Sequence, residues 1–284
     1  MIRDLQGGSS RRHRGERKAE QKAEQKGEQN MSVYEITFSP TGGTKKVSDI
    51  FTKSFSPEST YIDLISQKTD YTTYAFGPED ICIVSVPSYG GRVPDIAAKR
   101  LGQMKGNGAK AVLITVYGNR DYDDTFAELQ DVLEEAGFVC AAGVAAIAEH
   151  SIMRQFAAGR PNERDEKELA EFALRIRSAI ESGNAVGALK LPGNRPYREY
   201  GGVPMKPQAG KDCVRCGYCA KECPVGAISA EDPSETDNEK CISCMRCIAV
   251  CPQKARNVSK AMLIAGSMKL KKACSGYKEN KLFL

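Results

Sequence analysis

The sequence predicts an α/β protein, in which a doubly wound parallel sheet of five strands is followed by a smaller, cysteine-rich domain. Two observations lead to this prediction. Between residues 33 and 181, short apolar runs alternate with amphipathic stretches, a pattern typical of a parallel sheet with helices on both faces. Between residues 211 and 257, eight of the eleven cysteines fall into two short runs.

Length and charge agree with this division. A chain of 284 residues suits one medium domain and one small one. The formal charge is +5, but residues 1–30 contain eight basic and five acidic side chains, so the remainder is close to neutral. Nucleic acid is therefore not expected as the main partner. No stretch approaches the roughly 20 apolar residues that a membrane span needs, so no span is expected.

The first 30 residues offer almost no apolar side chain to bury. They include the near-repeat EQKAEQKGE from Glu20 to Glu28. Such a segment cannot offset the entropy cost of ordering, so we expect a disordered leader. Met31 opens the first strand-like run, and an alternative is that the natural chain starts there.

The elements of the first domain, residues 31–184, follow from the apolar periodicity. The five expected strands are Val33 to Phe38, Thr60 to Leu64, Ile81 to Val86, Ala109 to Val116 and Phe138 to Ala148. The four expected helices are Thr44 to Ser54, Asp95 to Met104, Asp124 to Ala136 and Glu163 to Glu181. Gly137 is expected to end the third helix.

Three further segments complete the chain. Residues 185–210 are rich in Gly and Pro, which predicts a linker or an irregular, packed connection. The cysteine-rich domain covers residues 211–257. Residues 258–284 are basic and amphipathic, so we expect a helical tail.

The cysteine runs have the spacing C-x2-C-x2-C-x3-C-P, and the second repeats the first at an offset of 28 residues. A 4Fe-4S cluster needs four converging thiolates, and in this motif the fourth cysteine of each run ligates the other cluster. The sequence therefore predicts two 4Fe-4S clusters. The expected ligands are Cys213, Cys216, Cys219 and Cys251 for one cluster, and Cys241, Cys244, Cys247 and Cys223 for the other.

Zinc is the alternative metal, because C-x2-C pairs also bind zinc, but structural zinc sites usually separate two pairs by a longer spacer. Thiolates reserved for iron need a reducing compartment, which favours the cytoplasm over a secreted disulfide scaffold.

A short loop, Ser39-Pro40-Thr41-Gly42-Gly43-Thr44, joins the first expected strand to the first helix. Backbone N–H groups and the hydroxyls of Ser39, Thr41 and Thr44 can surround an anion there, and the glycines allow close approach. Because the loop lacks the Gly-Lys-Ser/Thr ending of a triphosphate loop, a monophosphate is the better fit. An ordinary capped turn is the alternative.

Two more loops leave the third and fourth strands, at residues 87–92 and 118–124. In an open doubly wound sheet these loops meet the first one outside the carboxyl ends of the strands, where ligands bind. Tyr89 and Tyr122 could cover a flat ring there, although packing within the loops would also explain them.

Together these residues resemble the flavodoxin family, with S-x-T-G-x-T, YGG and YGNRxY in the three loops. The cysteine runs resemble bacterial-type two-cluster ferredoxins, an α+β fold, so that the chain from Met31 resembles flavodoxin–ferredoxin fusion proteins. The resemblance implies that FMN binds through its phosphate and its ring. The implied phosphate-binding residues are Ser39, Thr41, Gly42, Gly43 and Thr44, and the implied ring-framing residues are Tyr89, Gly90, Asn119 and Tyr122.

The remaining chemically active residues carry weaker expectations. His150 could donate a proton or hydrogen bond to a flavin, although a surface His at a strand end is the simpler interpretation. Cys82 and Cys140 are expected to be buried apolar residues. One departure from the ferredoxin pattern is Arg256, which replaces an apolar residue and could raise a cluster potential through charge or solvent access.

The sequence thus predicts an electron-transfer protein that relays electrons between FMN and two clusters and exchanges them with redox partner proteins. A second possibility is an oxidoreductase that reduces a small substrate at the FMN face, in a pocket lined by Glu149, His150, Arg92 or Arg120. A third is that the flavodoxin-like part binds no flavin and only docks partners.

Overall fold

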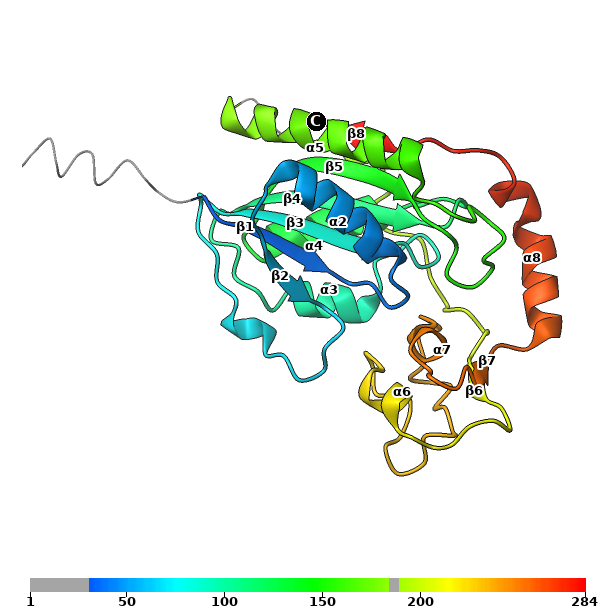
Figure 1. Cartoon of the computed structure of the whole chain (residues 1–284). Coiled ribbons are helices and arrows are strands. Elements are labelled where there is room, and N and C mark those ends of the chain that lie inside the picture. The colour runs from blue at the N-terminus through cyan, green and yellow to red at the C-terminus, as the bar shows by residue number, and fades with distance from the viewer. Residues whose placement is uncertain (1–30, 184–188) are drawn as a thin grey trace, which may run out of the picture. The chain divides into compact units, whose positions relative to one another are not determined.

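The fold is organised around a six-stranded sheet, seen in a computed structural model that describes residues 31–183 and 189–284 (Figure 1). Five strands are parallel and lie in the order β2-β1-β3-β4-β5, and β8 pairs antiparallel with β5. The parallel strands are β1 (Val33–Thr37), β2 (Thr60–Asp63), β3 (Ile81–Pro87), β4 (Lys110–Tyr117) and β5 (Val139–Ile147), and the antiparallel one is β8 (Lys281–Phe283).

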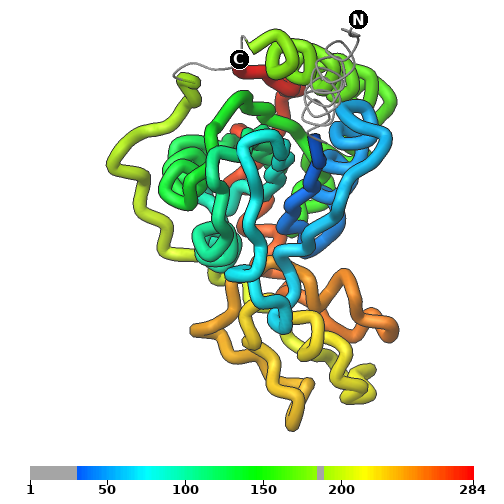
Figure 2. Tube along the Cα trace, turned by 90° about the vertical axis from the view of Figure 1, so that its left-hand side faces the viewer, coloured from blue at the N-terminus to red at the C-terminus, as the bar shows by residue number. Residues whose placement is uncertain are grey.

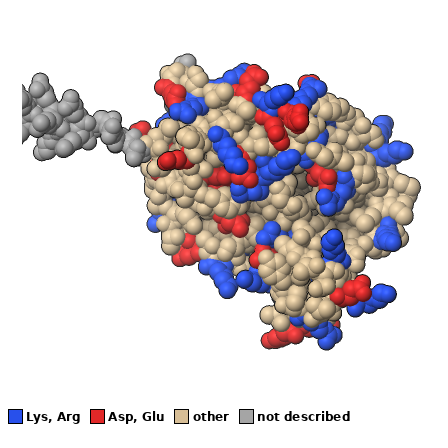
Figure 3. Space-filling model, viewed as in Figure 1, with Lys and Arg blue, Asp and Glu red and all other residues tan. Residues whose placement is uncertain are grey.

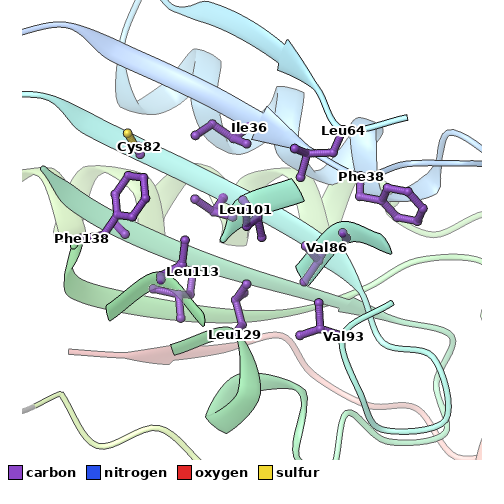
Figure 4. Close-up of a cluster of buried hydrophobic side chains, with 14 of the residues drawn as sticks. Ile36, Phe38, Leu64, Cys82, Val86, Val93, Leu101, Leu113, Leu129 and Phe138 are labelled. Atoms are coloured by element: carbon purple, nitrogen blue, oxygen red, sulfur yellow. The ribbon is translucent and has the colours of Figure 1, made fainter. Parts of the chain in front are cut away.

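Helices cover both faces of this sheet. Alternate residues of each strand point to opposite sides, so that Val84 and Ile83 of β3 belong to two different apolar cores. One core packs under α3 and α4, and Figure 4 shows part of it, including Leu101 and Leu129. The other packs under α2 and α5. The helices are α2 (Gly43–Phe55), α3 (Asp95–Leu101), α4 (Thr125–Glu135) and α5 (Glu163–Glu181).

The cysteine-rich segment has little regular structure. A short antiparallel ribbon joins its two ends, and each cysteine run contains one turn of helix. A longer helix, α8, follows, and β8 then returns to the sheet. The elements are β6 (Gln208–Ala209), α6 (Tyr218–Lys221), α7 (Arg246–Ala249), β7 (Arg256–Asn257) and α8 (Lys260–Cys274).

The connection between the two parts is packed rather than free. Arg195 forms an ion pair with Asp131 of α4, and the Asn194 backbone N–H donates to Asp124 at 2.7 Å. Figure 2 shows this connection, in yellow-green, running beside the sheet. Of the two possibilities for residues 185–210, the irregular packed connection is the one observed over the described residues 189–207.

The expected strands and helices of the first domain are confirmed, with ends that differ by at most three residues. Gly137, at φ 85°, follows α4 as expected, and Cys82 and Cys140 are buried in a core. The expected helical tail needs a correction, because the helix ends at Cys274 and β8 follows it. The expected disorder of residues 1–30 lies outside the described residues. In the described part of the chain, no helix is long and apolar enough to cross a membrane.

A buried polar network holds β8 and α5 to the sheet. Asn162 and Asp165 form a capping box at the start of α5, and Asp165 also pairs with Arg160 away from solvent. Burial alone would raise the pKa of Asp165, but hydrogen bonds from Arg160, Asn162 and Asn280 lower it overall. The Asn280 side chain accepts from the Ile147 N–H at 2.9 Å and donates to Asp165 at 3.0 Å.

We expect Asn280→Ala to destabilise the fold through this network. The change leaves the buried Ile147 N–H without its acceptor and removes one of the two donors to Asp165 Oδ1, at a cost of about 2 to 3 kcal/mol. For a chain of this size that lowers Tm by roughly 4 to 12 °C. Glu279→Ala is the control, because its ion pair with Arg164 is exposed and contributes about 0 to 1 kcal/mol. Thermal unfolding that is equal for both variants would contradict the structural role of Asn280.

Candidate functional site

The eight cysteines of the two runs line two small cavities, and each cavity takes cysteines from both runs. The first cysteine cavity is lined by Cys213, Cys216, Cys219 and Cys251. The second cysteine cavity is lined by Cys223, Cys241, Cys244 and Cys247. Each therefore combines three thiols of one run with the fourth thiol of the other. Four soft sulfur donors around one small volume is the donor set that a 4Fe-4S cluster requires.

The two runs have the same backbone conformation at several equivalent positions. Arg215 and Ser243, 28 positions apart, both have φ 54°, and Gly217 and Met245 both adopt the left-handed conformation before α6 and α7. After each run a backbone N–H donates to the fourth sulfur at 3.3 Å, from Ala227 to Cys223 and from Ala255 to Cys251. The same local geometry thus turns the thiols of each run inward.

The surroundings of the two cavities differ at several repeated positions, and one of these differences places a cation beside a sulfur. Arg256 lines the first cysteine cavity, and its Nε donates to the Cys219 Sγ at 3.3 Å. Ile228 stands 28 residues earlier and lines the second cysteine cavity. Arg256 is 2% exposed, so solvent access, one of the two effects expected for it, does not apply.

Residues beside the second cysteine cavity contact the sheet domain, at two loops and at α3. The Cys223 carbonyl accepts from Gln67, and the Pro224 carbonyl accepts from Arg100 at 2.8 Å. Arg246 pairs with Glu222 and also donates to the Pro40 carbonyl at 3.3 Å. Pro40 belongs to the loop after β1, so this cavity lies against the carboxyl ends of the parallel strands, where doubly wound sheets bind ligands.

The loop after β1 has the conformation that an anion site needs. Gly42 has φ 90°, and a Cβ there would meet nothing within 4 Å, so the backbone is open to a ligand. The Ser39 hydroxyl accepts the Lys45 N–H at 2.8 Å, which ties the loop to the first turn of α2. Thr44 is buried, whereas Thr41 is exposed. Thr41 is therefore the hydroxyl most accessible to a phosphate.

A small strand-end cavity of ≈70 Å³ brings together several of the expected flavin-binding residues. Thr41, Gly43, Thr44 and Tyr89 line it, together with His150. Tyr89 is half-buried, and burial of its hydroxyl, with smaller contributions from Cys244 and Tyr200, raises its pKa well above the usual range.

Three of the expected ring-framing residues face other partners. The Asn119 amide donates to the carbonyls of Cys274 and Gly276, at 2.7 and 2.8 Å, after α8. The Tyr122 ring packs edge-on against Tyr117 and Phe126, with centroids 5.3 and 5.4 Å apart. A side chain at Gly90 would overlap the Tyr200 ring. Their role at a flavin ring stays a prediction that this geometry does not support.

His150 is held as a neutral hydrogen-bond acceptor. Its Nδ1 accepts the N–H groups of Ile152 and Met153 at 3.2 and 3.3 Å, which assigns the proton to Nε2. Burial, with the nearby charge of Arg120, lowers its pKa. The side chain is therefore suited to donate a hydrogen bond from Nε2 into the strand-end cavity rather than to carry a positive charge.

A large cavity, of ≈610 Å³, is lined by both the phosphate-type loop and the cysteine-rich segment. Thr41, Gly42 and Gly43 form one wall, and Met245 and Ile248 form part of another. Glu149 lines it and is paired with Arg154, whereas Arg92, Arg120 and His150 do not line it. On the face drawn in Figure 3, basic and acidic side chains are interspersed, so no single charge sign dominates that surface.

Two functional contacts escaped the sequence analysis. Tyr200 comes from the connection and packs on Gly90, and Gln67 follows β2 and binds the Cys223 carbonyl. Neither residue lies in a recognisable motif. The aromatic residue Tyr200 within a Gly- and Pro-rich stretch was the one available signal.

Comparison with known proteins identifies the cysteine-rich segment. A family model described as a 4Fe-4S dicluster domain matches residues 212–255. "Ferredoxin-2" of Chlorobaculum tepidum is 42% identical over 48 residues, which are 14% of this chain and 77% of that protein. A component of an ion-translocating oxidoreductase complex of Methanosarcina acetivorans is 54% identical over 44 residues, 15% of this chain and 17% of that protein. The chain spans only 17%, 17% and 11% of the first three curated relatives that it matches.

Solved structures similar to the sheet domain include two flavodoxins. The flavodoxin of Streptococcus pneumonia is 19% identical, with a TM-score of 0.39. The match covers 52% of this chain and 99% of that flavodoxin. The flavodoxin of Fusobacterium nucleatum, bound to flavin mononucleotide, is 14% identical, with a TM-score of 0.37. The match covers 54% of this chain and 99% of that flavodoxin. The assignment of the fold rests on the strand order 2-1-3-4-5, which is that of flavodoxin, rather than on these scores.

The two lines of observation concern different parts of the chain. Residues 212–255 have the cysteine cavities, the matching family model and a ferredoxin relative covered over most of its length. The sheet has the strand order of a flavodoxin. The chain therefore belongs, through its cysteine-rich domain, to the two-cluster 4Fe-4S ferredoxins, and it has the architecture of a flavodoxin–ferredoxin fusion.

Proposed function

We propose that this chain is an electron-transfer protein that relays electrons between FMN and two 4Fe-4S clusters. The observation that carries the proposal is the pair of four-cysteine cavities, one of which lies against the ligand-binding edge of a flavodoxin-like sheet. The redox parts would be residues 31–184, completed by β8, and residues 211–257.

The ligand assignment follows from the two cavities. Cys213, Cys216, Cys219 and Cys251 would hold one cluster, and Cys223, Cys241, Cys244 and Cys247 the other. This is the crossed pairing expected from the motif, and the cavity linings support it. The thiolates require a reducing compartment, which we propose to be the cytoplasm.

The FMN assignment rests on the loop after β1. Gly42 leaves the backbone open, the Thr41 hydroxyl is exposed, and Ser39 fixes the loop on α2. The ring would then extend toward Tyr89 and the Nε2–H of His150 in the strand-end cavity. When bound, FMN exchanges electrons in pairs or singly, whereas each cluster exchanges one at a time.

The geometry supports an order for the relay. The second cysteine cavity is the inner one, because the Pro40 carbonyl contacts Arg246 and Gln67 contacts the Cys223 carbonyl beside it. The first is the outer one, since Cys216 is exposed and its neighbours Val214 and Tyr218 are 63% and 43% exposed. An apolar, exposed rim at the outer cavity suits docking of a redox partner protein.

The large cavity favours a second candidate function. A volume of ≈610 Å³ lies in the range of small-molecule sites, and its walls include Glu149 and the phosphate-type loop. A substrate bound there would make the protein an oxidoreductase fed by the clusters. Reduction of a small molecule by the loaded protein, with no partner protein present, would favour this function over the carrier.

We expect an anaerobically purified protein to contain iron and sulfide for two complete 4Fe-4S clusters together with one FMN per chain. Metal, sulfide and flavin quantified on the same sample test this composition. Zinc, or iron for a single cluster, would contradict the cluster assignment. Full iron without flavin would favour a sheet domain that only docks partners.

Removing the last cysteine of one run should damage the cluster that is held mainly by the other run. Cys251→Ala takes a sulfur from the first cysteine cavity, so the cluster seeded by Cys213, Cys216 and Cys219 should be lost or converted to a three-iron form. Cys223→Ala is the matched variant and should affect the other cluster. Electron paramagnetic resonance of both variants separates the two sites, and an uncrossed result would overturn the pairing.

Replacing Thr41 with Val keeps the shape of the loop but removes a hydrogen bond to a charged phosphate, which contributes about 1.5 to 3 kcal/mol. FMN binding should therefore weaken about 10- to 150-fold. Riboflavin, which lacks the phosphate, should bind the unmodified apoprotein poorly and respond little to the change. Titration with both flavins gives the answer, and equal affinities for the two would mean that this loop holds no flavin phosphate.

A further inference from the structure

Arg256 is a buried cation placed directly at one of the two cysteine sites. It begins β7, is 2% exposed, and its Nε donates to the Cys219 Sγ at 3.3 Å. The remaining guanidinium donors are also used, so the side chain is held in one orientation. Their acceptors are the carbonyls of Pro207, Pro233 and Glu235 and the hydroxyl of Thr236, at 3.4, 2.5, 3.3 and 2.8 Å.

None of these acceptors is a carboxylate. Within the described residues, no Asp or Glu side chain forms an ion pair with Arg256, whereas Arg246 pairs with Glu222. Buried charges are normally compensated, because an uncompensated ion in a low-dielectric interior is costly. The negative partner available to Arg256 is the sulfur of Cys219, and through it the thiolate-ligated group that this cavity would hold.

The internal repeat shows that this cation is not required by the cluster motif itself. The position 28 residues before Arg256 holds Ile228, which is 5% exposed and lines the second cysteine cavity. At this position the first cysteine site has a guanidinium bonded to sulfur and the second has an aliphatic side chain. The guanidinium that lines the second cavity, Arg246, is paired with Glu222. Other features of the two runs, such as the left-handed residues and the N–H···S contacts, are matched.

We propose that Arg256 makes the first cysteine site the stronger electron acceptor of the two. The proposal rests on the cluster assignment above. Reduction adds a negative charge, and a nearby cation and an N–H···S hydrogen bond both stabilise the reduced form more than the oxidised form. Electrons that enter at the flavin edge are then drawn past the inner site to the outer one, beside the exposed Val214 and Tyr218.

A buried positive charge acts over several ångströms, whereas the N–H···S hydrogen bond is directed at the Cys219 sulfur of the first site. Two substitutions separate these effects, because Arg256→Leu removes both and Arg256→Lys retains the charge without the planar guanidinium.

The test is a dithionite titration of the protein with both clusters bound. Hyperfine-shifted cysteine resonances, assigned to each run, report the reduced fraction of each site separately. In the unmodified protein the site of Cys213 should be reduced first. In Arg256→Leu the ratio of electrons on the first site to electrons on the second should fall by about tenfold or more. A tenfold change corresponds to a difference in reduction potential of about 59 mV for a one-electron couple. Arg256→Lys should give a smaller movement in the same direction.

Arg215→Gln is the control for loss of a charge in the same segment. Arg215 lies between Cys213 and Cys216, but its side chain is 69% exposed, so water and salt screen it. Its substitution should leave the ratio within about twofold. A comparable shift in Arg215→Gln would mean that general charge, rather than the buried contact, sets the order.

The outcomes also separate this inference from the proposed function. A protein without two clusters contradicts the cluster assignment, and Arg256 then has no such role. A protein with both clusters, whose occupancy ratio is unchanged in Arg256→Leu, contradicts the role of Arg256 alone. If Arg256→Leu fails to assemble its first cluster, Arg256→Lys decides, and a ratio equal to that of the unmodified protein would overturn the inference.

Discussion

Convergence of four sulfurs from two separate runs on one cavity is the constraint on which the cysteine-rich domain depends. Each cavity needs the fourth cysteine of the other run, so neither run can adopt its final shape alone. The domain has little apolar material of its own, with a cluster of four buried residues that consists of Cys219, Ala220, Ile228 and Cys247. Bonds to bound clusters would therefore supply much of the cross-linking, as a structural metal does in other small domains.

Polar contacts to backbone carbonyls hold this domain on the sheet, beside an apolar cluster in which Met153 and Phe156 pack with Met245 and Val258. Arg100, Gln67 and Arg246 reach across between the parts, and each joins a backbone carbonyl of one part to a side chain of the other. Carbonyl groups near the cysteine runs have fixed positions because the runs themselves are fixed. The contacts therefore set the position of the second cysteine cavity relative to the loop after β1.

Local patterns in the sequence were sufficient for the five parallel strands, for α5 and for the grouping of the eight cysteines around two cavities. Apolar periodicity places these strands because β1, β3, β4 and β5 are buried on both faces, and the spacing of the cysteines reflects the geometry of one loop. Contacts between distant segments were not predictable in this way. Asn119 binds carbonyls 155 and 157 residues later, and the three residues of β8 are too few for a periodic signal. The environment of Arg256 was half predicted: the sequence marks the unusual charge, but only the fold shows that it is buried against Cys219.

The final strand also determines how the two parts can be separated. Because β8 pairs with β5 after the chain has passed through the cysteine-rich segment, that segment is topologically an insertion within the sheet domain. Both of its ends are anchored, which disfavours a carrier that swings on a single tether. A sheet domain that ends at residue 210 would expose the N–H and C=O groups along one side of β5. A strand of another chain could then pair with this edge. A minimal sheet domain would instead need β8 reconnected to α5 by a short loop, with the cysteine-rich segment excised between two cuts.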